Sequence, residues 1–340
     1  MANRVIGLAA AGLWFGLAAT SPALADDGLA QFKKSIESQI PPGALAYKSA
    51  KALGDNGFEL DDVVITPPAS DPNKKPDPIR VKAITVETLD FDSINKQQPP
   101  LFAKVKFDGI AAASGTGGID LKSMAGIDSL SADFGIDYKL DAGAKTFTLK
   151  RMELNLNGLA KLQTSFVVNG VSADAASKPD AAMKDASLKT ADLTYDDHSL
   201  LSIAVPVAAA MQGSDPKALT AMAIGFLDGM RVGQGDLAQK AIDSLVAYVE
   251  DYQKPKGPLK ITLNPPGPVT DADLNNAKTA DQMVKLLGIQ VSYAGTRSSK
   301  PDESGAGMAG AGVTGAGAKD VPAKDEDEDS DSKTLDKKKD

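Results

Sequence analysis

The chain has one histidine, and carboxylates and a hydroxyl lie beside it. His198 follows Asp196 and Asp197 and precedes Ser199. These are the residue types of nucleophilic hydrolysis, but a catalytic triad needs the fold to bring a distant nucleophile to the imidazole. Ser199 is adjacent in sequence, so the pattern favours a turn at a strand end with an exposed histidine over a catalytic site.

Carboxylates also recur with a short repeat. Gly-Ile-Asp occurs three times and places Asp120, Asp128 and Asp137 eight to nine residues apart. Converging carboxylates are calcium ligands, and Ca²⁺ takes six to eight oxygens. The same residues are equally consistent with the water-facing row of antiparallel strands. The strand interpretation is favoured, and no metal site is predicted.

Two glycine-rich stretches resemble ligand loops. Gly305, Gly307 and Gly310 form a GxGxxG, but no strand precedes it and no helix follows, as a dinucleotide site requires. Residues 115–120 partly match a calcium-binding nonapeptide that does not recur, which indicates a turn. The sequence therefore predicts no cofactor-binding residues and no catalytic residues.

The composition excludes further chemistry. There is no cysteine, and the single tryptophan is Trp14. Thiol catalysis, thiolate metal sites and a lipid anchor on an N-terminal cysteine are therefore excluded. The formal net charge of −8, without a basic groove interleaved with aromatic residues, argues against nucleic acid as a partner.

Residues 1–25 have the layout of a secretory signal peptide. A positive start at Arg4 is followed by an apolar run over 5–19 and by the small-x-small triplet that ends at Ala25. The run is shorter than the roughly 20 residues of a membrane-spanning helix, and no later segment is longer. We expect cleavage after Ala25, no remaining transmembrane segment, and a periplasmic or secreted protein of a Gram-negative bacterium.

The N-terminal part of the mature chain is predicted to be helical over residues 26–57. Leu29, Phe32 and Ile36 recur at helical spacing, and a second helix is expected from Ala44 to Leu53. Prolines between 67 and 78 then predict a loop before the β-rich part that begins at residue 79.

Residues 58–296 are predicted to form one α+β domain. Its β-rich part covers 79–205, with clean alternation in 133–141, a hairpin turn at 141–145, a bulge near 150–151, and strands at 193–195 and 201–205. The helix-rich part covers 206–293. It contains a start at Ser214-Asp215-Pro216 with Leu219, Met222, Phe226 and Met230 at helical spacing, a longer helix over 236–252, a strand at 259–263, capping boxes at Thr270 and Thr279, and a last strand at 289–293.

Residues 297–340 are predicted to be a disordered tail. The stretch 303–318 is mostly glycine and alanine, and 319–340 is charged, with acidic residues over 325–329 and lysines over 337–339. This composition supplies no core. The complete prediction is a large, curved antiparallel sheet packed against a few C-terminal helices, followed by the tail.

The strand-rich middle, the segment Leu193-Thr194-Tyr195-Asp196-Asp197-His198-Ser199-Leu200 and the helices behind it resemble uncharacterised proteobacterial periplasmic proteins with long antiparallel sheets, AsmA-like in style. The resemblance covers residues 79–205 and transfers no functional residue. It implies envelope upkeep with lipid handling, although AsmA-like proteins are longer and lack a cleaved leader and a tail.

These observations predict a non-enzymatic periplasmic protein that binds a lipid or another apolar ligand in envelope maintenance. The alternatives are a structural or interaction protein with an envelope partner, and a hydrolase that uses paired carboxylates as acid and base. A hydrolase would require one carboxyl group with a raised pKa in a cleft.

Overall fold

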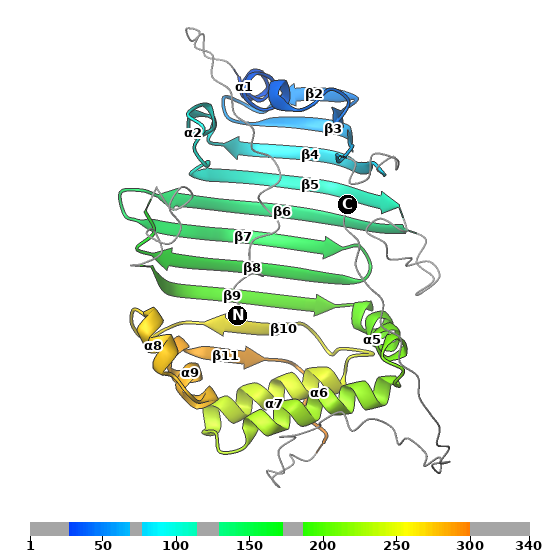
Figure 1. Ribbon diagram of the computed structural model, residues 1–340, viewed down its shortest axis with the longest axis vertical. Helices are drawn as coiled ribbons and strands as arrows, with labels where there is room; N and C mark the ends of the chain where they lie inside the picture. The colour runs from blue at the N-terminus through cyan, green and yellow to red at the C-terminus, as the bar shows by residue number, and fades with distance from the viewer. Residues whose placement is uncertain (1–26, 69–76, 114–128, 173–185, 300–340) are drawn as a thin grey trace, which may run out of the picture. The chain divides into compact units, whose positions relative to one another are not determined.

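An antiparallel sheet and flanking helices make up the part of the protein that the computed structural model describes, residues 27–68, 77–113, 129–172 and 186–299 (Figure 1). The strands are β1 (Leu45–Ala46), β2 (Ser49–Ala52), β3 (Phe58–Ile65), β4 (Ile79–Leu89), β5 (Phe102–Ala113), β6 (Ser129–Asp141), β7 (Thr146–Leu156), β8 (Ala160–Asn169), β9 (Ser187–Asp197), β10 (Leu259–Leu263) and β11 (Ile289–Ser292). The helices are α1 (Gly28–Ser35), α2 (Phe91–Asn95), α5 (Leu200–Met211), α6 (Pro216–Arg231), α7 (Asp236–Glu250), α8 (Asp271–Asn276) and α9 (Ala280–Leu287), with a 3-10 turn, η1, at Glu37–Gln39. The predicted α+β class with a large antiparallel sheet is confirmed.

Among the described residues the sheet has 11 strands and is not closed. From β3 to β11 every strand pairs antiparallel with the next one along the chain, and β1 and β2 both pair with β3. Because sequential strands are neighbours throughout, the topology needs only short-range pairings apart from the helical insertion between β9 and β10.

The bulge predicted near 150–151 is present. Asp137 pairs with Arg151 while the next residue, Tyr138, pairs with Leu149, so Lys150 is the extra residue on β7. An unpaired residue shifts the alternation by one position, which is why the apolar residues of β7 change phase at this point.

The predicted helix at 44–53 is wrong. This segment forms β1 and β2, and Lys51 of β2 forms an ion pair with Glu59 of β3 at 2.8 Å. Helix propensity is a weak tendency that pairing with a neighbouring strand overrides. Strands of this sheet therefore lie before residue 79, outside the stretch predicted to be β-rich.

The predicted strand at 201–205 is also wrong, because these residues begin α5. The buried carboxylate of Asp197 accepts hydrogen bonds from the backbone N–H of Leu201, at 3.1 Å to one oxygen and 3.4 Å to the other. A capped first turn favours a helix, and three alternating apolar residues also fit a helix that is apolar all round.

The later start and stop signals are confirmed. Asp215 caps α6 with Pro216 in its first turn, and Thr270 and Thr279 form capping boxes with Asp273 and Gln282. The strands at 259–263 and 289–292 lie as predicted. The predicted leader 1–25, Asp120 and Asp128, the GxGxxG at 305–310 and residues 300–340 of the predicted tail lie outside the described residues. The prediction that the tail begins at 297 is wrong, because Arg297 pairs with Asp228 and Asp243 while Ser298 and Ser299 donate to Glu250.

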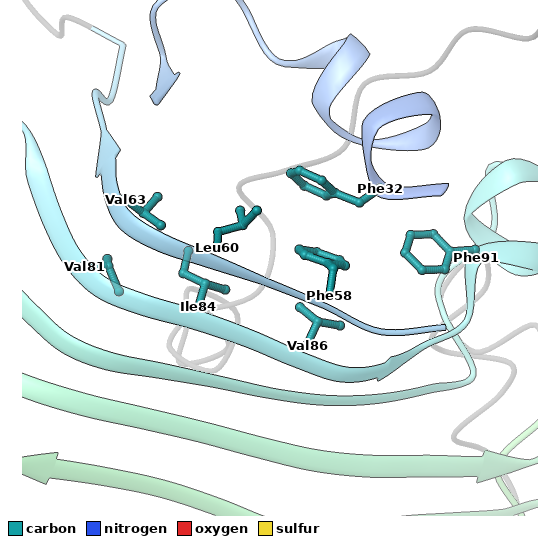
Figure 2. Packing of buried hydrophobic residues seen from close by; sticks show 8 residues of the cluster. All are labelled: Phe32, Phe58, Leu60, Val63, Val81, Ile84, Val86 and Phe91. Atoms are coloured by element: carbon teal, nitrogen blue, oxygen red, sulfur yellow. The ribbon is translucent and has the colours of Figure 1, made fainter. Parts of the chain in front are cut away.

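One buried hydrophobic cluster lies where α1 and α2 meet β3 and β4 (Figure 2). The Phe32 ring of α1 stacks on the Phe58 ring of β3 with centroids 4.3 Å apart, and Phe91 of α2 lies 6.4 Å from Phe58. The remaining members come from β3 and β4: Leu60, Val63, Val81, Ile84 and Val86. This cluster covers one end of the sheet.

Candidate functional site

His198 lies in the exposed turn between β9 and α5, as predicted. Its backbone N–H and that of Ser199 both donate to the carbonyl of Leu159, at 2.9 and 3.0 Å, and the Ser199 hydroxyl donates to the Gly158 carbonyl at 3.1 Å. Asp197 is buried and accepts from the Tyr195 hydroxyl at 2.6 Å. The arrangement stabilises a turn and a helix start.

Two carboxylates that lie close together in the described part of the chain share a cation, since Asp228 and Asp243 both pair with Arg297. Asp137 lies on the polar face of β6 and is 3.7 Å from Lys150. No three His, Asp or Glu side chains among the described residues are arranged to hold a metal ion. Burial alone would raise the pKa of a carboxyl group, but hydrogen bonds lower the pKa of four of them below the usual range. These are Asp90, Glu153, Glu250 and Asp273. A general acid needs the opposite shift, a raised pKa.

The sheet has one apolar face that runs across consecutive strands. Phe107, Phe134, Leu154, Leu162 and Tyr195 lie opposite one another on β5 to β9. Their chain neighbours point to the other face and are mostly polar, as period-two alternation requires. We define the apolar face by these residues and by Ala103, Val105, Ile136, Tyr138, Leu149, Met152, Phe166 and Val168.

The helices that the structure describes cover this sheet only at its two ends. In the described part of the chain, α1 packs on β2 and β3, whereas α7 and α9 pack on β11 (Figure 1). Tyr248 of α7 reaches the apolar face, because its ring lies 6.2 Å from that of Tyr195 on β9. The middle strands β5 to β8 have no described helix packed on them to a comparable extent.

The middle of the apolar face is therefore only half-buried. On β6 and β8 only Ala160 is buried among the described side chains, and Leu154 on β7 is 36 % exposed. Aromatic rings contact one another along it: Phe107 with Phe134 at 6.1 Å, Tyr138 with Phe147 at 5.8 Å, and Phe147 with Phe166 at 5.7 Å. A long apolar surface bounded by covered ends is a surface suited to an elongated apolar ligand.

An apolar pocket of about 220 Å³ lies beside the covered C-terminal end, between α5, α6 and α7. Its lining residues are Leu201, Val205, Leu219, Thr220, Ala223, Tyr248, Val249 and Tyr252. The Tyr248 hydroxyl is buried without a hydrogen-bond partner among the described residues, and burial, with Asp197 nearby, raises the pKa of Tyr248. A neutral phenol on an apolar pocket wall offers one polar contact.

Sequence reasoning missed this pocket, because three helices that are separate in the chain build it. The spacing of Tyr248 and Tyr252 on the predicted helix 236–252 was the available signal, but it marks a buried stripe and not a cavity. The predicted α6 stripe of Leu219, Met222, Phe226 and Met230 exists, yet its last three side chains are exposed.

No helix in the described part of the chain is both long and apolar enough to cross a membrane. A protein-family profile described only as "Uncharacterized protein" matches residues 153–294, from β7 to just beyond β11. That stretch contains every residue of the pocket and five residues of the apolar face, Leu154, Leu162, Phe166, Val168 and Tyr195. Among curated proteins, none matches the chain.

Proposed function

We propose that this protein is an exported, non-enzymatic carrier that holds a lipid or another apolar ligand against the open middle of its sheet. The observation that carries the proposal is the apolar face of β5 to β8, which is only partly buried between two covered ends and on which Leu154 is 36 % exposed. Contiguous apolar patches beyond a few hundred Å² are rare on soluble proteins unless they bind something. The expected biological setting is maintenance of the cell envelope.

The width of the open region and the spread of aromatic rings along it favour a long ligand over a compact one. Four adjacent strands at roughly 4.8 Å spacing give the open region a width of about 15–20 Å, with aromatic rings distributed along it. An acyl chain laid across the strands would contact Phe134, Leu154 and Leu162 in turn, because these residues lie opposite one another. Each buried CH₂ contributes about 0.8 kcal/mol. The headgroup would remain in water.

Export is the second part of the proposal and rests on the layout of residues 1–25. The mass of the protein recovered from a periplasmic fraction tests it, and the expected N-terminus is Asp26. Recovery of intact protein that begins with Met1 from the cytoplasm would overturn export and leave ligand binding to be judged separately.

Uptake of a fluorescent fatty acid tests ligand binding. Phe166 and Val167 are adjacent, half-buried residues of β8 that point to opposite faces of the sheet. Phe166→Lys places a charge on the apolar face and should weaken uptake at least about tenfold. The matched variant Val167→Lys should leave uptake within about twofold, because its side chain points away from the ligand.

Two results would overturn the carrier proposal. One is wild-type protein that shows no saturable uptake, and the other is equal loss of uptake in both lysine variants while both remain folded. A stable protein complex that Phe166→Lys abolishes, without any uptake by the wild type, would instead support an envelope interaction protein.

A further inference from the structure

Helix α6 presents an uncharged, apolar side to the solvent. In the described structure the exposed residues between 221 and 230 are only alanine, glycine, methionine and phenylalanine. The large ones are Met222, Phe226 and Met230, with 55 %, 70 % and 44 % of each residue exposed. The solvent-facing side of a helix normally carries charged residues, so this side is expected to contact something apolar.

The charges nearest to this side are paired within the same copy of the chain. Asp228 is buried and pairs with Arg297, and Arg231 pairs with Asp243. These pairs fix α6 in place, so its apolar side is already formed before a partner binds. Charged residues are depleted at the centre of protein interfaces, and the exposed side of α6 has this character.

The same helix forms one wall of the apolar pocket of about 220 Å³ that lies between α5, α6 and α7. Ala223 lines this pocket and is exposed, so the pocket reaches the surface on the apolar side of α6. The Thr220 hydroxyl of this wall donates to the carbonyls of Pro216 and Lys217, at 2.9 and 3.0 Å. An apolar cavity of about 150 Å³ can hold a benzene molecule, so this pocket has room for one phenyl ring.

Phe226 lies beside the pocket without filling it. It follows Ala223 by three residues, which places both on the same side of the helix and about 4.5 Å apart along its axis. Because 70 % of Phe226 is exposed, its ring points to solvent and leaves the pocket of its own chain open. Each copy of the chain therefore carries an apolar ring and an apolar pocket next to each other.

One antiparallel arrangement of two α6 helices joins ring and pocket in both directions. A two-fold axis that passes between Ala223 and Phe226 brings Phe226 of each copy opposite Ala223 of the other. The same register brings Met230 opposite Leu219, because Leu219 precedes Ala223 by four residues and Met230 follows Phe226 by four. Leu219 and Ala223 both line the pocket. The surface is therefore self-complementary, as a two-fold interface requires.

The exposed apolar area is sufficient for a dimer of ordinary size. With Met211 before α6 and Val232 and Leu237 after it, the large exposed side chains present roughly 600 Å², taking about 180 Å² for a fully exposed one. A standard interface covers about 800 Å² on each partner, and about 65 % of a homodimer interface is apolar, which is roughly 520 Å². The area permits a second copy, and the match between ring and pocket identifies it.

We propose that α6 is the dimer interface of this protein. A second copy packs antiparallel on this helix, and each copy inserts Phe226 into the pocket of the other. An aromatic side chain that enters an apolar pocket is a common form of interface hot spot. This inference goes beyond the proposed function, because it holds whether or not the sheet binds a ligand.

Sedimentation velocity of the full chain over a range of concentrations tests the dimer. Phe226→Ala removes the ring, and Ala223→Phe fills the pocket from its own wall. Each variant should raise the dissociation constant of the dimer at least about tenfold. Both positions are exposed, so circular dichroism should show that both variants remain folded.

Leu154→Ala is the matched control, because it shortens a large apolar side chain on the sheet and leaves α6 unchanged. It should keep the dissociation constant of the dimer within about twofold of the wild-type value. It should also weaken fatty-acid uptake, which the two α6 variants should leave intact. Dimer formation and ligand binding therefore fail separately.

A mixture of the two α6 variants tests the contact between ring and pocket directly. A homodimer of Phe226→Ala has open pockets and no ring, and a homodimer of Ala223→Phe has rings and no open pocket. A mixed dimer keeps one complete contact, and at its second contact the introduced ring faces the introduced alanine. The mixture should therefore associate at least about tenfold more tightly than either variant alone.

Three outcomes would overturn the dimer. They are wild-type protein that remains monomeric up to about 100 µM, an unchanged dissociation constant in Phe226→Ala, and a mixture that associates no better than its components. Binding of monomeric wild-type protein to phosphatidylcholine vesicles, lost in Phe226→Ala, would instead identify a lipid surface as the occupant of α6.

Discussion

Arg297 and Asp228 form a buried ion pair at 2.7 Å, and only 8 % and 7 % of their side chains are exposed. Arg297 also contacts Asp243 of α7 at 2.9 Å. Glu250, further along α7, accepts the backbone N–H groups of Ser298 and Ser299 at 2.7 and 2.8 Å. The segment that follows β11 is therefore bonded to both α6 and α7. These bonds hold α6, the helix that exposes Met222, Phe226 and Met230, against the end of the sheet.

We expect Arg297→Ala to destabilise the protein strongly. Removing one partner leaves the buried carboxylate of Asp228 uncompensated, which typically costs about 3–5 kcal/mol. Urea unfolding followed by circular dichroism measures the loss. Arg151→Ala is the matched control, because the pair of Arg151 with Glu153 has a 59 % exposed arginine and should contribute at most about 1 kcal/mol. Equal losses in both variants would contradict this assignment.

Asp90 should give the fold part of its acid sensitivity. Its buried carboxylate accepts from Leu101 N–H at 2.9 Å and from Ser93 N–H and hydroxyl at 3.1 and 2.6 Å. Burial alone would raise the pKa of Asp90, but these hydrogen bonds lower it overall. The folded pKa is then below the unfolded value of about 3.9, so this stability is present above that pH and lost as the pH falls through the folded pKa.

Asp90→Asn is therefore expected to lower the free energy of unfolding at neutral pH by about 1–3 kcal/mol and to flatten its decline in acid. Urea unfolding at several pH values between neutral and acid measures both effects. Asp273→Asn, which alters an exposed capping box on α8, should change the acid dependence less. A decline in acid as steep as that of the wild type would exclude the role assigned to Asp90.

Gly57 lies where no side chain fits. A Cβ at this position would come within 2.6–2.7 Å of the carbonyl oxygens of Glu87, Leu53 and Val86, all backbone atoms at the junction of β2, β3 and β4. Gly57→Ala should therefore destabilise the fold by about 1–3 kcal/mol or more. Gly229→Ala, in open space on α6, should instead stabilise it by about 0.5–1 kcal/mol, and thermal unfolding of the two variants should move in opposite directions.

Local patterns predicted most of the sheet, since alternation in 133–141 and the phase change near Lys150 are consequences of strand geometry itself. They failed where a partner decides the outcome. Residues 44–53 are good helix formers that pair with β3, and Leu201 lies in the first turn of a helix, where its backbone N–H donates to the buried carboxylate of Asp197. The exposure of the apolar face and of α6 was not predictable from periodicity, because an apolar stripe such as that of Phe226 looks the same whether or not another element covers it.

Tyr138 should make the protein sensitive to alkali. It lies on the apolar face, where its hydroxyl donates to the Pro100 carbonyl at 3.2 Å, and burial, with a smaller effect of Asp90, raises the pKa of Tyr138 to about 12. Because the unfolded value is about 10, this group's stabilisation is complete below pH ~10 and is lost as the pH rises towards 12.

The linked loss at Tyr138 amounts to roughly 2–3 kcal/mol between these pH values. Tyr138→Phe removes that contribution, so the free energy of unfolding should fall less steeply between about pH 9 and 12 than in the wild type. Spectrophotometric titration of the tyrosines should also lose one late-titrating group. Tyr47→Phe is the control, because the Tyr47 hydroxyl donates to Glu37 at 2.9 Å and does not lie on the apolar face. This variant should keep the tyrosine titration at high pH that is assigned to Tyr138. If the late step persists in Tyr138→Phe with unchanged amplitude, the hydroxyl of Tyr138 is not the group that burial protects.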